Sequence, residues 1–379
     1  VAQDGKITAL GPDAAIPAGA QVLDGRGLRV YPGLIDANTS TGLAEISSVE
    51  ETVDGNEMGD LKPQLQAYGA IHPASEHISV TRVEGVTTVL TLPRGGTVSG
   101  QATLLNLDGW TVEEMVVRRS AGMVATIPSP NTAGGFNPAT RTVTRRAFPD
   151  AVREAERRQA ELAELLDQAR HYHNARAART STPFDARLEA MGPVLTGALP
   201  VLALANSPRA IRSAVEFCKK QKLKVVIVGG SGAARVAGFL KEHEVPVIFG
   251  PVQSLPDRDD APYDLPYATP GILAKAGVRF AISPGSTQFS RTLAFEAGTA
   301  AGNGLSEADA LKAITLWPAQ ILGLDTQLGS LEVGKMANLV VTEGDVLEIR
   351  SRIRHVFIRG RPIPLESKHT RLWKQFLVR

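Results

Sequence analysis

The sequence has one cysteine, few aromatic residues, almost no net charge and no long apolar run. Its single cysteine, Cys218, excludes a disulfide framework and a zinc site built from several thiolates. Lysine and arginine number 41 against 39 aspartate and glutamate, a net charge of +2, which argues against a strongly basic nucleic-acid-binding protein. No stretch reaches the ~18 consecutive apolar residues of a membrane-spanning helix. Neither nucleic acid nor a membrane is therefore an expected partner.

The first residues are typical of the middle of a sheet. The chain begins at Val1, without methionine, and Asp4-Gly5 between apolar-rich runs predicts a hairpin turn. We therefore expect that further residues precede this sequence. No signal peptide is visible, but with the start missing its absence says little about the compartment, so a soluble protein is expected, with both the cytoplasm and export open.

From Gly27 onward, short apolar strands alternate with helical stretches, which is the pattern of parallel βα units. Helices are expected between the strands, and a long charged surface helix is expected from Phe148 to about Arg179. Seven strands are expected at Val30–Ile35, Val86–Leu92, Gly122–Ile127, Pro200–Ala205, Lys224–Val228, Val245–Phe249 and Val278–Ile282. With an eighth in the long middle stretch of the chain, they predict an α/β fold of the (β/α)8 TIM-barrel type.

An open, doubly wound sheet is the alternative to the barrel. It is weakened because VGGSGAAR, after Ile227, lacks the G-x-G-x-x-G spacing of a dinucleotide-binding turn. At the C-terminal end, Gly329–Val341 and Val356–Pro364 are typical of antiparallel strands with glycine turns, like the segments before residue 31. We therefore predict a small β-sandwich composed of residues 1–30 and 327–379, with the barrel at residues 31–326.

Three segments resemble those of one known family. Tyr31–Ser40 (YPGLIDANTS) is similar to the end of the first barrel strand of the amidohydrolase superfamily, the metal-dependent hydrolases that include imidazolonepropionase and dihydroorotase. Gly304–Leu324 and Gly329–Val341 resemble its last barrel helix and its return into the sandwich. The resemblance covers essentially the whole chain. It implies a barrel with a composite sandwich and a hydrolase acting on C–N bonds other than peptide bonds, such as those of cyclic amides and imides.

The resemblance also implies zinc or another divalent metal, held by a His-x-His pair after strand 1, histidines after strands 5 and 6, and an aspartate after strand 8. Such ligands let the ion lower the pKa of a bound water toward ~7. In this chain Asn38-Thr39-Ser40 stands in place of the His-x-His pair. Leu204 or Asn206 stands at the strand 5 position, Gly229 at strand 6, and the residues from Ser283 to Ser286 at strand 8. The metal-ligand positions are therefore substituted.

The seven histidines are not expected to replace these ligands. His171 and His173 are two residues apart on a predicted helix, so their side chains diverge by about 200° and cannot share one ion. The other five lie outside the predicted strand ends, at His72, His77, His243, His355 and His369. Structural or solvated roles are expected for all seven, and no metal cofactor is predicted.

A pocket of mostly neutral, hydrogen-bonding residues is expected at the barrel mouth. The candidates are Asn38, Ser40, Arg94, Asn206, Gly229, Ser231, Ser283 and Ser286. They include no paired carboxylates and no activated nucleophile, so no catalytic residue is identified. Arg94 is interpreted as an exposed loop residue, with pairing to a substrate carboxylate as the alternative. The loop after strand 6 is expected to cover the mouth, with Tyr263 and Tyr267 as candidate ligand contacts.

Three functional hypotheses follow. The first is a degenerate member of the family, a pseudoenzyme that keeps the fold, has lost metal-dependent hydrolysis or is severely impaired in it, and binds a small molecule or nothing at the barrel mouth. The second is an active hydrolase of cyclic amides or imides with a divergent site, for example in the acidic loop after strand 1. The third is a non-catalytic assembly subunit that docks on a catalytic partner. Homo-oligomers are compatible with all three.

Overall fold

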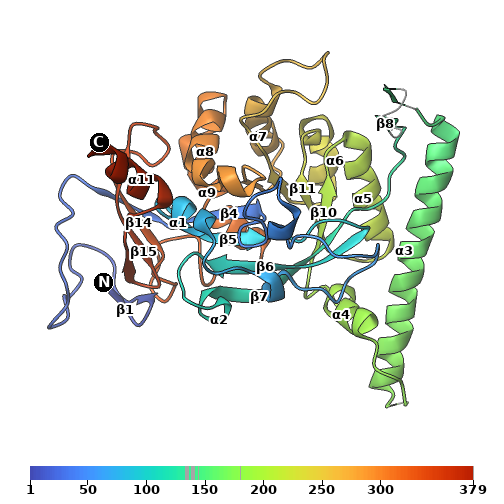
Figure 1. Ribbon diagram of the computed structural model, residues 1–379, viewed down its shortest axis with the longest axis horizontal. Coiled ribbons are helices and arrows are strands. Elements are labelled where there is room, and N and C mark those ends of the chain that lie inside the picture. The colour runs from blue at the N-terminus through green and yellow to red at the C-terminus, as the bar shows by residue number, and fades with distance from the viewer. Residues whose placement is uncertain (133–135, 138–140, 144, 180, 379) are drawn as a thin grey trace.

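A mostly parallel, eight-stranded sheet curves into a nearly closed barrel at the centre of the molecule (Figure 1). The computed structural model describes residues 1–132, 136–137, 141–143, 145–179 and 181–378. The barrel strands run in the order β13 (Phe280–Ile282), β12 (Val247–Phe249), β11 (Val225–Gly229), β10 (Val201–Ala205), β7 (Val116–Ala125), β6 (Val98–Asn106), β5 (Val86–Thr91) and β4 (Leu34–Thr39). The predicted barrel is confirmed, together with a separate antiparallel sheet.

The position expected for the eighth strand is wrong. That strand is β6, which lies between the second and third predicted strands and runs antiparallel to both of its neighbours. Its alternate residues Ser99, Gln101 and Thr103 are polar, yet all three are buried. A strand of this composition is typical of a solvent-facing segment, because burial of polar side chains depends on partners that are distant in sequence.

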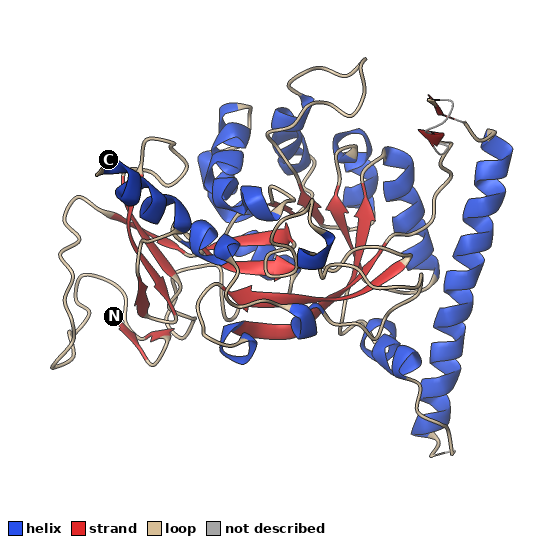
Figure 2. Cartoon of the chain, in the orientation of Figure 1, coloured by secondary structure: helices blue, strands red, loops and turns tan. Residues whose placement is uncertain are grey.

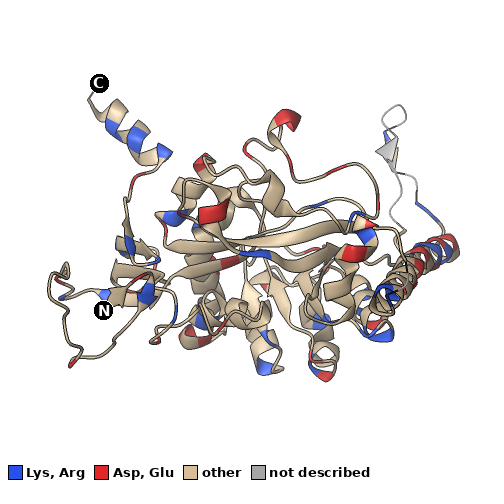
Figure 3. Cartoon of the chain, turned by 90° about the horizontal axis from the view of Figure 1, so that it is seen from below, with Lys and Arg blue, Asp and Glu red and all other residues tan. Residues whose placement is uncertain are grey.

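The described part of the long middle stretch adds no strand to the barrel sheet. It forms α3 (Phe148–Ala177) and α4 (Ala186–Leu195), with the short strands β8 (Phe136–Asn137) and β9 (Thr142–Val143) before them. α3 stands at the end of the molecule farthest from the terminal sheet (Figures 1 and 2). Acidic and basic residues are interspersed along it (Figure 3), while Leu162, Leu166 and Tyr172 are buried. The predicted long surface helix is confirmed.

The barrel sheet is buried on both faces. Its interior is filled by small and branched side chains from every strand, among them Ile35, Leu90 and Val226. Its outer face packs against the surrounding helices. The remaining helices and short 3-10 turns before the terminal sheet are η1 (Glu50–Thr52), η2 (Ala67–Ala70), α1 (Glu76–Arg82), α2 (Val112–Met115), α5 (Pro208–Lys220), η3 (Ala233–Val236), α6 (Ala237–Glu242), α7 (Leu265–Lys275), η4 (Thr287–Thr292), α8 (Leu293–Gly302), α9 (Glu307–Ala313) and α10 (Leu316–Ile321). Within the described ranges, no helix combines the length and the apolar character needed to cross a bilayer.

A four-stranded antiparallel sheet joins the two ends of the chain. Its strands are β16 (Arg361–Ile363), β15 (Arg352–Ile358), β14 (Leu339–Glu343) and β3 (Arg29–Pro32). The hairpin of β1 (Ala2–Gln3) and β2 (Lys6–Ile7) touches it through a bridge between Lys6 and Met336. α11 (Lys368–Leu377) follows, and both chain ends lie at this side of the molecule (Figure 1). Segments from both ends therefore share one sheet, while the bounds 1–30, 31–326 and 327–379 stay a prediction.

Side chains around Asp36 bridge β4 and β13, the two edges of the barrel sheet. Ser283, just after β13, donates its hydroxyl to Asp36 Oδ1 at 2.5 Å, and Ser290 of η4 donates to Oδ2 at 2.6 Å. The backbone N–H of Asn38 also donates to Oδ1, at 3.2 Å. Asp36, Ser283 and Ser290 are all fully buried. Burial raises the pKa of the Asp36 carboxyl, although the hydrogen bonds favour its charged form.

This buried acid should make stability depend on pH. Because its pKa is higher in the folded than in the unfolded chain, its contribution is fully present at low pH and is lost as pH rises through the folded pKa. Asp36→Asn removes that titration. The free energy of unfolding of the wild type should therefore fall relative to that of Asp36→Asn as pH rises, by up to about 1.4 kcal/mol for each unit of elevation. Urea unfolding from pH 4 to pH 8 measures the difference.

Ser290→Ala is the companion variant. It removes one hydrogen bond to the charged carboxylate, so stability should fall more steeply with pH than in the wild type. The buried Glu296 is present in every variant, and its pKa is raised mainly by burial, which is common to them, and to a smaller extent by the charge of Asp36, which Asp36→Asn removes. Parallel pH profiles for the wild type and Asp36→Asn would contradict this role of Asp36.

The barrel interior also leaves no room for a side chain at Gly122 of β7. A Cβ there would lie 2.5 Å from both Cγ and Cδ1 of Leu202, which is fully buried. Gly122→Ala should lower the free energy of unfolding by about 1–3 kcal/mol through overpacking. Gly238→Ala is the matched control, because nothing lies within 4 Å of a Cβ at this helical site. It should leave stability unchanged or raise it by up to about 1 kcal/mol; equal urea midpoints for the two variants would refute the steric argument.

Candidate functional site

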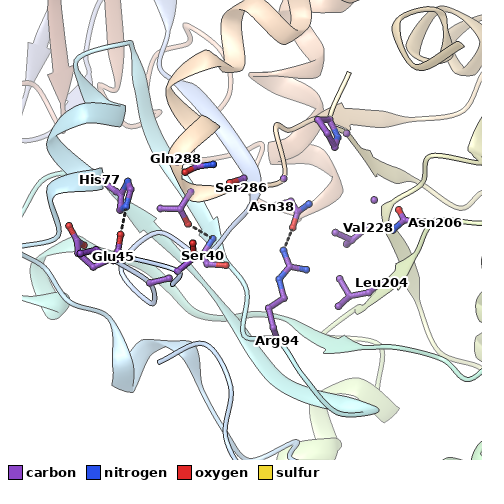
Figure 4. A pocket seen from close by; sticks show the side chains of 18 residues that line it. Asn38, Ser40, Glu45, His77, Arg94, Leu204, Asn206, Val228, Ser286 and Gln288 are labelled. Atoms are coloured by element: carbon purple, nitrogen blue, oxygen red, sulfur yellow. Dashed lines mark hydrogen bonds between the residues drawn. The ribbon is translucent and has the colours of Figure 1, made fainter. Parts of the chain in front are cut away.

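A cavity of about 700 Å³ opens at the carboxyl-terminal ends of the barrel strands (Figure 4). This is the end of a TIM-type barrel at which the loops after the strands build ligand sites. Asn38 lies near the end of β4, Leu204 and Val228 lie near the ends of β10 and β11, and Ser286 follows β13. The hairpin loop between β5 and β6 contributes Arg94. Side chains from segments far apart in the sequence therefore meet at one opening.

The structure brings six of the eight predicted pocket residues together. Those that line the cavity are Asn38, Ser40, Arg94, Asn206, Gly229 and Ser286. Ser283 lies beneath it, fully buried, with its hydroxyl on Asp36. Ser231 lies in the turn after β11, where its hydroxyl contacts the Asn206 carbonyl oxygen at 3.4 Å, and does not line the cavity. Tyr263 and Tyr267 do not line it either.

The prediction that Arg94 is an exposed loop residue is wrong, because Arg94 is half-buried in the cavity wall. Its Nη2 donates to Asn38 Oδ1 at 2.6 Å, the contact drawn in Figure 4. Its backbone N–H donates to the Gly55 carbonyl oxygen at 2.7 Å, which fixes the loop. Burial lowers the pKa of the Arg94 guanidinium, but the group keeps its charge because its ordinary value is so high. The mouth therefore contains a permanent positive charge.

Backbone N–H groups of the glycine turn after β11 are used in hydrogen bonds to the end of β10. Gly229 has a φ of +100°, and a Cβ there would lie 2.3 Å from Asn206 Oδ1. The N–H groups of Gly230 and Gly232 donate to the carbonyl oxygens of Ala205 and Asn206. These donors are therefore unavailable to an anion, and the glycines are required by the backbone conformation of the turn.

Two titratable residues in the cavity wall were not among the predicted pocket residues. His77, on α1, has its Nε2 2.9 Å from the Glu45 carbonyl oxygen. The Glu45 carboxylate accepts hydrogen bonds from the Ser75 hydroxyl at 2.6 Å and the Glu76 N–H at 3.0 Å. No sequence signal marks His77, because α1 precedes its strand and reaches the mouth only through tertiary packing. Both groups are engaged in holding the loop against α1.

The residues at the mouth do not fit a divalent metal. The implied ligand positions carry neutral amides and hydroxyls or, as at Leu204 and Gly229, no polar side chain, and Asn38 Oδ1 already accepts from the Arg94 guanidinium. A fixed cation at this position repels a second one, and zinc prefers imidazole, thiolate or carboxylate ligands. Across the part of the chain that the structure describes, no group of three or more His, Cys, Asp or Glu side chains is placed to hold a metal ion.

Comparisons with known proteins connect the chain to one family. A sequence profile of the Amidohydrolase family matches residues 281–364. Amidohydrolase tasK of Hapsidospora irregularis is 22% identical over 396 residues, which cover 97% of this chain. The match covers only 40% of tasK, so this chain corresponds to less than half of that relative.

Solved structures share the whole architecture. That of an amidohydrolase from Thermotoga maritima is similar with a TM-score of 0.83 and 26% sequence identity, over 96% of this chain and 94% of that chain. That of a molinate hydrolase is similar in fold, with a TM-score of 0.56 and 18% identity, over 96% of this chain and 90% of that chain. The matching profile, the tasK relative and the Thermotoga maritima structure support the amidohydrolase superfamily as the family of this chain, and the barrel joined to a terminal sheet is the fold that the solved structures share.

Proposed function

We propose that this chain is a metal-free, hydrolytically impaired member of the superfamily whose barrel mouth binds a small molecule. The observation that carries the proposal is the hydrogen bond from the Arg94 guanidinium to Asn38 Oδ1, 2.6 Å long. The permanent positive charge of Arg94 therefore lies against Asn38, a position at which the resemblance implies a metal ligand. The cavity of about 700 Å³ is of a size that suits a small organic ligand.

The other groups near the mouth support impaired hydrolysis. Attack on an amide requires an activated water or nucleophile and a positioned general base. Asp36 is fully buried and already accepts three hydrogen bonds, so it cannot contact a substrate. His77 Nε2 lies against the Glu45 carbonyl oxygen, and the Glu45 carboxylate accepts from Ser75 and the Glu76 N–H, so these two groups are not arranged as a carboxylate–imidazole pair.

An active hydrolase with a divergent site is the second candidate. It is favoured by the 26% identity, over nearly the whole chain, to a protein named amidohydrolase. It is also favoured by the presence of His77 and Glu45 in the same cavity wall. A screen of hydantoins, dihydropyrimidines, lactams and N-acyl amino acids, with and without added divalent metal, separates the two candidates. Turnover that His77→Ala abolishes would establish the second.

Metal analysis tests the first candidate directly. After tag removal, incubation with zinc or manganese and desalting, the wild type should retain far less than one equivalent of metal per chain. The positive control is the triple variant Asn38→His/Ser40→His/Arg94→Gln. It places two imidazoles on one face of the strand end and removes the fixed cation, so it should retain more zinc than the wild type. About one tightly held equivalent of zinc, manganese or iron in the wild type would overturn the proposal.

A further inference from the structure

The Arg94 guanidinium lacks an anionic partner within the described protein. No carboxylate among the described residues lies within 4 Å of it, and desolvation acts on it without an opposing negative charge. Its single side-chain hydrogen bond to these residues goes to the neutral amide of Asn38. Among the half-buried arginines, Arg82 lies 3.6 Å from the Asp108 carboxylate, whereas the side chains of Arg118 and Arg359 donate to backbone carbonyl oxygens. A partly desolvated charge without a counter-ion is costly, and a bound anion would remove that cost.

The guanidinium is held in place and still has free donors. The Asn38 contact uses one N–H of Nη2, and neither Nε nor Nη1 donates to any residue that the structure describes. The loop is pinned on both sides of Arg94, by Arg94 N–H to Gly55 and by Thr97 N–H to Asp60 Oδ1 at 2.9 Å. A guanidinium presents parallel N–H groups that match the two oxygens of a carboxylate.

We propose that the barrel mouth binds a small molecule through its carboxylate, which pairs with Arg94. This inference rests on the proposed function, because it assumes that the ligand meets the guanidinium rather than a metal ion. The charges around the cavity favour a monoanion over phosphate. Arg94 supplies one positive charge, and the Glu45 carboxylate in the same wall would repel a second negative charge on the ligand.

The side chains beside Arg94 indicate which other groups the ligand carries. Leu204 and Val228 lie on one side of the guanidinium, while Ser40 and Ser286 lie on the other (Figure 4). An apolar substituent would pack on the first pair, and an amide or hydroxyl could hydrogen-bond to the second. N-acyl amino acids with an aliphatic side chain combine these three features, which makes them suitable probes.

The test compares N-acetyl-L-leucine with its primary amide, N-acetyl-L-leucinamide, by calorimetry or ligand-observed NMR. The two probes differ only in the charged group, so the acid should bind at least about ten-fold more tightly than the amide. Inorganic phosphate, the third probe, should bind more weakly than the acid. Arg94→Met should abolish the preference for the acid, and Arg94→Lys should retain part of it, because the charge remains but the planar fork is lost.

Arg118→Met is the matched control. Arg118 lines a different cavity and donates one hydrogen bond to the Leu322 carbonyl oxygen, so its removal also costs one side-chain contact. This variant should keep the preference for the acid. Thermal melting of both variants verifies that each is folded, and the comparison of acid with amide on the wild type does not depend on any variant.

The outcomes separate this inference from the proposed function. Equal binding of acid and amide, no binding of either, tighter binding of phosphate, or a preference that survives Arg94→Met would each overturn the carboxylate site. Release of acetate from N-acetyl-L-leucine, followed by proton NMR, would contradict impaired hydrolysis. That release would leave the assignment of Arg94 to the carboxylate intact if the difference between acid and amide persisted.

Discussion

The buried carboxyl of Asp36 holds together the two edges of the barrel sheet. It accepts hydrogen bonds from Ser283 and Ser290, which lie after β13, and it belongs to β4. Parallel strands elsewhere in the sheet are joined by backbone ladders, so this is the position where side chains close the barrel. The mouth lies directly above it, because Asn38 both donates its N–H to Asp36 and accepts from Arg94 through its side chain. The geometry of the cavity therefore depends on this buried contact.

The strands that consist of continuous apolar and β-branched residues were predictable from the sequence. β5 and β11 are continuous runs of apolar and β-branched residues, as expected of strands covered on both faces. β6 was missed because Gln101 is buried by a contact with the Pro63 carbonyl oxygen, 38 residues away. Hydrophobic periodicity carries no information about such a partner.

The location of the candidate site could be predicted from the sequence, but the side-chain contacts within the site could not. The ends of predicted strands identify Asn38, Asn206 and Ser286, since the carboxyl ends of parallel strands meet at one end of a barrel. The burial of Arg94 could not be read from a glycine-rich loop, because it depends on the packing of residues 55–60 over that loop. The same holds for His77, which an independent helix brings to the mouth.

The reversal of β6 affects how the binding end of the barrel can move. A regular βα unit would continue from β5 into a long loop and a helix, and loops of that kind can rearrange around a ligand. A strand that turns back directly leaves only the short segment from Leu92 to Thr97 at the rim, tied down on both sides. The Arg94 loop is thus already ordered in the folded chain. The conformational entropy that is lost in fixing the guanidinium is lost on folding, so ligand binding does not bear this cost. This sector of the rim is preorganised, and induced fit at the mouth has to come from the other loops.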